Sequence, residues 1–343
     1  MLKLLSVPII QAPMAGGVAT PKLAAAVSNS GGLGFLAAGY KTAKEMKEEI
    51  KTVRKLTKFP FGINVFVPGQ DDIQSSYLIQ YQNEIKKEAD RLNCKINEPV
   101  YDDDEWNQKI SILIQEKVPV ISFTFGCPSP ETLSKLKVGG SYIIVTITTP
   151  EEALIAKEAG ADALCVQGIE AGGHRASFQN NPKNDEQYDL QDLLNKVRTT
   201  TNLPLIAAGG IMNGRDVFRA LNSGASAVQM GTAFLLCPES GTNDAYRKAL
   251  KNPIFEQTAV TRAFTGRPAR GLVNEFLTKY NQIAPAAYPQ VHHMTKDLRK
   301  MASQINEPQF MSLWAGTRFK AIQEVSASDV VKKIRMELNN LKY

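Results

Sequence analysis

The chain has 343 residues, of which 43% are hydrophobic and 22% are charged, a composition that is typical of a globular protein and excludes a disordered one. The formal net charge is +6, but the lysines and arginines are scattered through helix-like stretches, which indicates solvated helix faces and argues against a nucleic-acid partner. No apolar run is long enough to cross a bilayer, so we expect no membrane partner either.

Eight short, largely apolar segments, each followed by turn residues, are predicted to be buried strands. In chain order they are Val7–Ile10, Leu33–Ala37, Phe61–Phe66, Val118–Phe125, Tyr142–Ile147, Ala163–Gln167, Leu203–Ala207 and Ala227–Met230. Helices are predicted between them, most clearly over Pro21–Ser30, Ala43–Leu56, Pro150–Ala159 and Gly214–Ser223. Thr20 and Thr149 each precede a proline, as a helix N-cap does. Eight strands that alternate with helices predict an α/β fold, a (β/α)₈ TIM barrel.

Additions to the barrel are predicted at three places: insertions near 70–116 and 174–190, and a C-terminal helical extension from about 239. Within the first insertion, Asp71–Leu92 is predicted to be a helix. Within the second, the polar stretch Ser177–Gln187 is predicted to be a mobile loop and a candidate lid. Because no linker composition separates the predicted strands, we expect residues 1–343 to form a single domain.

The cysteines and histidines predict no metal site. Cys94, Cys127, Cys165 and Cys237 lie far apart without CxxC spacing, so they indicate neither a zinc site nor a disulfide framework. His292 and His293 are adjacent, and adjacent residues of a helix point in different directions. The chain begins with too short an apolar run for a signal peptide, so a reducing cytoplasm is the expected location.

Glycines end the last two predicted strands: Gly209 and Gly210 follow one, and Gly231 follows the other. Glycine lets backbone N–H groups approach an anion closely, and the loops after strands seven and eight of a barrel commonly bind phosphate. Tight turns are the alternative explanation for each glycine alone. The pair on consecutive strands favours a phosphate site.

The other strand ends restrict the ligand further. They carry no lysine for a Schiff base, no facing carboxylates for hydrolysis, and no GxGxxG after a strand. The segment Gln11–Gly17, which follows the first predicted strand, has a backbone that a ligand can approach closely. The amide side chains of Asn64 and Gln167 lie at the ends of two other predicted strands. An amide offers both a hydrogen-bond donor and an acceptor, which suits a flavin ring or its ribityl hydroxyls. Each amide could equally be a core residue that bonds to another part of the protein.

These segments resemble the nitronate monooxygenases, once called 2-nitropropane dioxygenases. The matching segments are Ile10–Gly17, Phe61–Phe66, Val166–Arg175, Ala207–Ile211, Gln229–Thr232, Thr261–Arg267 and Leu313–Gly316. The resemblance implies an FMN cofactor, with a small-molecule nitronate and O₂ as substrates. The FMN-binding residues that it implies are Ala12, Pro13, Met14, Asn64, Gln167, Gly172, Gly173, Gly209, Gly210, Gln229, Met230, Gly231 and Thr232.

The same resemblance makes His174 the catalytic histidine. It follows Gly172–Gly173 at the mouth of the sixth predicted strand, where a side chain can lie over the flavin. With an ordinary pKa near 6.5, an imidazole can bind a nitronate oxygen or accept a proton from a nitroalkane. Tyr288 and Cys127 are further candidates for the substrate pocket, although a cysteine in such a place is more often a small apolar filler.

The implied function is an FMN-dependent nitronate monooxygenase that oxidises alkyl nitronates such as propionate 3-nitronate with O₂, which is a detoxification. One alternative is a flavin- and NAD(P)H-dependent enoyl-acyl-carrier-protein reductase, whose barrel and Gly-Gly-His motif are similar and whose acidic carrier would suit a basic surface. A non-enzymatic flavin-binding protein is a second alternative. The extension with Tyr288–Met301 and Trp314–Gly316 favours the nitronate enzyme. The oligomeric state is left open.

Overall fold

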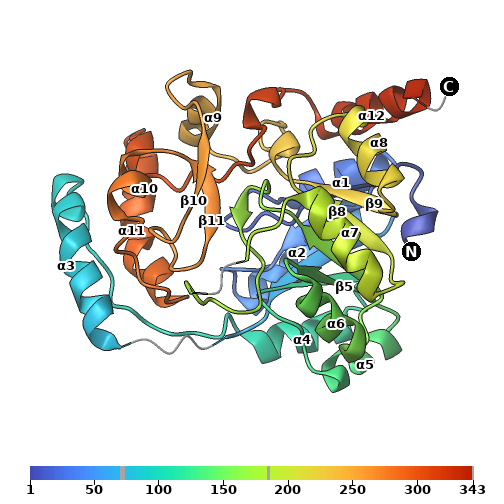
Figure 1. The fold of residues 1–343 in the computed structure, drawn as a ribbon, viewed down its shortest axis with the longest axis horizontal. Helices are drawn as coiled ribbons and strands as arrows, with labels where there is room; N and C mark the ends of the chain where they lie inside the picture. The colour runs from blue at the N-terminus through green and yellow to red at the C-terminus, as the bar shows by residue number, and fades with distance from the viewer. Residues whose placement is uncertain (70–73, 184–185, 342–343) are drawn as a thin grey trace.

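Eight parallel strands close into a barrel in the computed structural model, which describes residues 1–69, 74–183 and 186–341 (Figure 1). Around the barrel the strands follow the order β1 (Ile9–Gln11), β9 (Ala227–Met230), β8 (Leu205–Ala208), β6 (Ala163–Gln167), β5 (Tyr142–Ile147), β4 (Val120–Thr124), β3 (Phe61–Phe66) and β2 (Gly34–Ala37). A parallel bridge between Ile10 and Leu33 joins β1 to the residue before β2, which closes the ring. The predicted (β/α)₈ barrel is confirmed.

The strand positions are also confirmed. Four of them have the predicted bounds, namely β3, β5, β6 and β9, and the others differ by one or two residues at an end. The strands are almost entirely buried, as in β5, because side chains fill the barrel and helices cover it. Short, continuous apolar runs are therefore the pattern that this fold requires.

Helices cover the outside of the barrel. They are α1 (Pro21–Asn29), α2 (Ala43–Leu56), α4 (Trp106–Gln115), α5 (Pro130–Val138), α6 (Pro150–Ala159), α7 (Leu190–Thr200) and α8 (Gly214–Asn222). The hydroxyls of Thr20 and Thr149 accept the backbone N–H groups of Leu23 and Glu152, so both predicted N-caps are confirmed. The last helix, α12 (Ala327–Leu341), packs against both α8 and α1 and completes the outer layer.

The C-terminal extension forms a second body beside the barrel (Figure 1). Its elements are α9 (Asp244–Lys251), β10 (Thr258–Thr261), β11 (Ala269–Leu272), α10 (Glu275–Tyr280) and α11 (Gln290–Gln304). The inserted helix α3 (Ser75–Arg91) packs on α11, which confirms the predicted inserted helix in its described part. Residues 71–73 of that prediction lie outside the described residues.

The extension is not only helical, which differs from the expectation. Strands β10 and β11 form a hairpin, and β11 also pairs with β7 (Gly173–His174), the short strand that follows β6. Two residues are too few to show an alternating pattern, and the partner strand lies more than 90 residues further along the chain. This antiparallel sheet ties the segment after β6 to the extension.

Three clusters of buried hydrophobic residues stabilise the fold. The first lies between the barrel strands and the outer helices, the second lies under the extension around Phe264, Phe276 and Phe310, and the third contains strand residues such as Phe35 and Ile144. The described part of the predicted loop at 177–187 contains no helix or strand, and its role as a lid stays a prediction. Among the described residues, no helix has both the length and the apolar composition to span a membrane.

Candidate functional site

A cavity of about 1080 Å³ lies between the carboxyl ends of the barrel strands and the extension. It brings together His174, Tyr288 and all the residues that the sequence assigned to the cofactor: Ala12, Pro13, Met14, Asn64, Gln167, Gly172, Gly173, Gly209, Gly210, Gln229, Met230, Gly231 and Thr232. Cavities of this size hold a cofactor-sized ligand. The structure therefore gathers residues from positions 12 to 288 of the chain at one place.

Cys127 does not line this cavity, so its expected place in the pocket wall is corrected. The chain turns at Phe125, whose φ is +74°, and the Phe125 ring lies 5.6 Å from the ring of His174. Cys127, two residues later, packs against the barrel core instead. Burial raises the pKa of its thiol to about 11, as expected for a structural cysteine.

Glycines shape the floor of the cavity at the ends of β8 and β6. Gly209 and Gly210 have φ values of +128° and +65°, a region that side chains other than glycine rarely adopt. At Gly172 an added Cβ would lie 2.5 Å from the backbone of Ala315 and Gly316. The Leu313–Gly316 segment therefore approaches β7 so closely that only glycine fits there.

Both predicted amide side chains are held by the protein itself. The Asn64 amide donates to the hydroxyls of Ser122 and Thr124, each at 2.9 Å. The Gln167 amide donates to the carbonyl of His174 at 3.0 Å and accepts from the N–H of Ala176 at 2.9 Å. Gln167 thus fixes the backbone at the histidine and two residues after it, which is a positioning role in addition to its place in the cavity wall.

His174 is held by a hydrogen bond that also selects its tautomer. Its Nε2 lies 2.9 Å from the hydroxyl of Thr265, which donates its one proton to the Arg267 carbonyl at 3.3 Å. With its own proton on that carbonyl, the hydroxyl can accept from His174, an arrangement that places the imidazole proton on Nε2 and leaves Nδ1 as the acceptor.

The imidazole of His174 is neutral in the free protein. Burial, followed by the positive charges of Arg267 and Arg299, lowers its pKa to about 3. Aromatic rings surround it: the centroids of Phe125 and Trp314 are each 5.6 Å away, and that of Tyr288 is 6.2 Å away. This apolar wall excludes water from the face of the ring.

A second histidine, His292, also lines the cavity. The His292 ring stacks on Tyr40 with centroids 4.0 Å apart and planes 3° apart. The Arg299 guanidinium lies 3.1 Å from Nδ1 of His292, and burial holds the pKa of His292 well below its ordinary value. Its neighbour His293 points elsewhere and lies 2.5 Å from the carboxylate of Asp102, as expected for adjacent helix residues.

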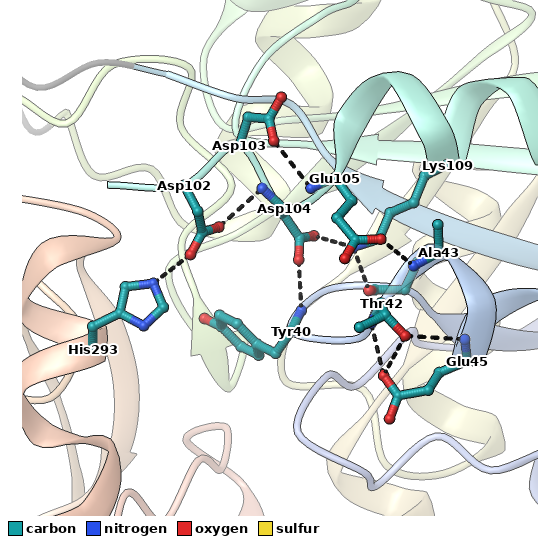
Figure 2. Close-up of polar contacts among 11 residues, drawn as sticks. Tyr40, Thr42, Ala43, Glu45, Asp102, Asp103, Asp104, Glu105, Lys109 and His293 are labelled. Carbon is teal, nitrogen blue, oxygen red and sulfur yellow. Dashed lines mark hydrogen bonds and ion pairs between the residues drawn. The ribbon is translucent and has the colours of Figure 1, made fainter. Parts of the chain in front are cut away.

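The acidic segment Asp102–Glu105, which lines the cavity, holds the Tyr40 loop in place (Figure 2). The carboxylate of Asp104 accepts the backbone N–H of Tyr40 at 3.1 Å and pairs with Nζ of Lys109 at 2.8 Å. Burial raises the pKa of Asp104 to about 6, which still leaves it ionised at neutral pH. Next to it, Glu105 accepts the N–H of Ala43 at 2.7 Å and so attaches the segment to the start of α2.

Sequence reasoning missed several residues of this site. Thr265 lies inside a matching segment but was given no role, and Tyr40, His292 and Arg299 come from parts of the chain without a recognised pattern. Pairs such as Tyr40 and His292 are separated by about 250 residues, and only the fold shows that they meet. Among the described residues, no group of three or more His, Cys, Asp or Glu side chains is placed to hold a metal ion.

Comparison with known proteins identifies the family. The family model described as nitronate monooxygenase matches residues 1–337. A probable nitronate monooxygenase of Staphylococcus aureus (strain Newman) is 38% identical over 340 residues, which cover 97% of this chain and 95% of the relative. A solved nitroalkane oxidase from Streptomyces ansochromogenes is 45% identical with a TM-score of 0.96, over 99% of this chain and 98% of the other.

More distant structures share the fold. FabK from Thermotoga maritima is 28% identical with a TM-score of 0.77, over 99% of this chain and 95% of the other. The match to the family model over nearly the whole chain, together with relatives at 38% and 45% identity, decides the assignment. The chain belongs to the nitronate monooxygenase family and is a flavin-dependent oxidoreductase.

Proposed function

We propose that the protein is an FMN-dependent nitronate monooxygenase that oxidises alkyl nitronates such as propionate 3-nitronate with O₂. The observation that carries the proposal is the cavity that joins the glycine-lined strand ends to a half-buried, neutral His174. The family supports the reaction class, and the choice of FMN and of the nitronate follows from the resemblance of the sequence segments named above to that family.

The residues of the cavity fit FMN. Backbone N–H groups at Gly210, Gly231 and Thr232 are the proposed phosphate site, because the glycines allow an anion to approach the main chain. The start of α8 is less suited, since the N–H of Gly214 already donates to the Glu337 carboxylate at 2.5 Å. The remaining cofactor residues named above would surround the ribityl chain and the ring.

FMN supplies the redox chemistry when it is bound, and the protein supplies placement and proton handling. His174 presents Nδ1 as an acceptor, so it can take the proton of a neutral nitroalkane and release the nitronate next to the ring. A substrate that arrives as the nitronate does not need this proton transfer. The rings of Phe125, Tyr288 and Trp314 keep water away from this step.

The proposed role is detoxification of nitronates in the cytoplasm. All four cysteines are free thiols, which suits a reducing compartment. A non-enzymatic flavin-binding role does not agree with membership of this enzyme family. An enoyl-acyl-carrier-protein reductase remains the second candidate, because FabK shares the fold at 28% identity.

The test is to purify the protein, release its flavin by heat, and identify the flavin by mass. Oxygen uptake is then followed with propionate 3-nitronate and with propane 1-nitronate, and NADH-driven reduction is followed with a crotonyl thioester. We expect released FMN and oxygen uptake with both nitronates. Turnover of the thioester without oxygen uptake would assign the protein to the reductases, and flavin-free protein that refuses FMN on reconstitution would overturn the proposal.

A further inference from the structure

Arg299 on α11 places part of its guanidinium in the wall of the cavity. Its Nε donates to the hydroxyl of Thr295 at 3.1 Å, and its Nη2 donates to the carbonyl of His292 at 3.0 Å. Among the described residues, none accepts a hydrogen bond from Nη1. The guanidinium is thus held through Nε and Nη2, while the two N–H groups of Nη1 remain for a ligand.

The charge of Arg299 also lacks a counter-ion. In the part of the chain that the structure describes, no carboxylate oxygen lies within 4.0 Å of its guanidinium nitrogens. The carboxylates at the cavity mouth have other partners, since Asp102 pairs with His293 and Asp104 pairs with Lys109. A half-buried guanidinium that lines a cavity without a counter-ion favours the binding of an anion there.

The position of Arg299 indicates which anion this is. Arg299 and His174 line the same cavity from different elements, and the Arg299 charge acts on the His174 ring. Tyr288 lies near both histidines, with its ring centroid 6.2 Å from that of His174 and 6.5 Å from that of His292, the residue to which Arg299 is bonded. A short aliphatic substrate with an anionic group at each end could therefore meet His174 with one end and Arg299 with the other.

We propose that Arg299 is a specificity-determining residue that binds a carboxylate at the far end of the nitronate substrate. The inference rests on the proposed function and narrows it to ω-carboxylated nitronates. Lys296 and Lys300 also line the cavity, but both are exposed at the rim. Their charges are screened by water, whereas the Arg299 fork is held in one orientation.

The test compares two nitronates on the flavin-loaded enzyme: propionate 3-nitronate, which carries a carboxylate, and propane 1-nitronate, which does not. For Arg299→Gln we expect the ratio of their kcat/KM values to fall by about 10- to 100-fold, mainly through KM of the carboxylated substrate, as loss of a charge-assisted hydrogen bond predicts. Arg299→Lys should recover part of the ratio. Lys300→Gln, which removes the same charge from the rim, should change it by less than about threefold.

A binding measurement separates this inference from the proposed reaction. Succinate resembles propionate 3-nitronate in shape and charge, and butyrate lacks the second anionic group. By calorimetry we expect the wild type to bind succinate more tightly than butyrate and Arg299→Gln to lose the preference. If oxygen uptake is absent but this preference is present, nitronate oxidation fails and the carboxylate site stands.

Three results would overturn the role of Arg299. The first is a wild type without a preference for succinate, the second is an equal loss of kcat/KM for both nitronates in Arg299→Gln, and the third is a ratio that Lys296→Gln abolishes and Arg299→Gln leaves intact. The second result would mean that Arg299 only supports the fold around His292. Flavin content measured for each variant checks that the cavity is still formed.

Discussion

The phenol ring of Tyr40 lies flat on the imidazole of His292, with centroids 4.0 Å apart and ring planes 3° apart. Tyr40 and His292 lie about 250 residues apart in the chain, and each is held in place by a further residue. Asp104 holds the backbone of Tyr40, and Arg299 bonds to Nδ1 of His292. Through Asp104 and Tyr40, the stack therefore connects the inserted segment before α4 to the extension helix α11.

The ion pair between Asp104 and Lys109, which holds the Tyr40 loop, should contribute strongly to the stability of the fold. Lys109 is fully buried and its ammonium contacts Asp104 and the carbonyl of Ala38. Asp104→Asn and Lys109→Met should each lower the free energy of unfolding by about 3–5 kcal/mol, because each leaves the other partner uncompensated. Urea unfolding measures this.

The double variant Asp104→Asn/Lys109→Met is the decisive comparison. It should be more stable than the sum of the two single changes predicts, by about 1–3 kcal/mol, because neither charge is then left alone. Glu131→Gln, which breaks the exposed pair with Lys135, should cost less than about 1 kcal/mol. Strict additivity of the two single changes would show that the pair has no such role.

His174→Asn should keep the bound flavin and lose most turnover. The Gly172–Gly173 backbone and the Gln167 contacts that shape the cavity do not depend on the imidazole ring. Loss of a positioned acid–base group typically lowers kcat by about 10²- to 10⁴-fold. The flavin absorbance and the oxygen-uptake rate are measured on the same sample, with His293→Asn as the matched histidine control. Unchanged turnover would remove the proposed role of His174.

Thr265 is expected to act as a positioning residue through the tautomer of His174. Thr265→Val removes the acceptor for Nε2–H, so the ring can place its proton on Nδ1 and lose its basic nitrogen. We expect kcat with a neutral nitroalkane to fall by about 10-fold or more, with a smaller effect for a preformed nitronate, and Thr265→Ser to restore it. Equal losses for the two substrates would indicate a merely structural role.

The buried histidines predict how stability depends on pH. The pKa of His174 is about 3 in the folded protein and about 6.5 in the unfolded chain, so its folded pKa is lowered. Its contribution is fully present above pH 6.5 and is lost as the pH falls towards 3, by about 1.4 kcal/mol for each pH unit. His292, whose pKa is also lowered by burial, acts in the same direction.

Unfolding curves between pH 7.5 and 5 check this prediction. The stability of the wild type should fall towards pH 5, and His174→Asn should show a shallower slope because one of the two groups is gone. A slope that His174→Asn does not change would contradict a neutral imidazole whose pKa is lowered in the folded protein.

Local patterns were sufficient to predict the barrel and the cofactor end of the site. A strand buried on both faces leaves a continuous apolar run, as in Tyr142–Ile147, and a strand end that approaches a ligand leaves glycine, as at Gly209 and Gly210. Both signals are contained in a few consecutive residues. The carboxyl ends of parallel strands meet at one face of a barrel, so the residues that follow them could be grouped without a structure.

The substrate end of the site could not be predicted in the same way. Arg299, His292 and Tyr40 come together in the cavity wall only through contacts between distant segments, and each alone resembles an ordinary helix or loop residue. The error at Cys127 has the opposite cause: it follows a strand, but the turn at Phe125 carries it away from the cavity. Position after a strand predicts the neighbourhood of a side chain and not its direction.

Two adjacent glycines offer a test of how closely the Leu313–Gly316 segment fits against β7. In Gly172→Ala the new Cβ would lie 2.5 Å from the backbone of Ala315 and Gly316, which cannot move aside as a flexible side chain could. Gly173→Ala would have no atom within 4 Å of its Cβ, but its φ of +78° is unfavourable for alanine. The two substitutions therefore isolate a packing clash and a backbone strain at neighbouring positions.

We expect Gly173→Ala to cost about 1–2 kcal/mol of unfolding free energy and to retain flavin. Gly172→Ala should cost more, because overpacking against backbone adds about 1–3 kcal/mol or more, and it should weaken flavin binding since the displaced segment lies against the cavity. Thermal unfolding and the flavin dissociation constant are measured for both. If Gly172→Ala proves the milder of the two, the Leu313–Gly316 segment does not rest on β7 as closely as the structure places it.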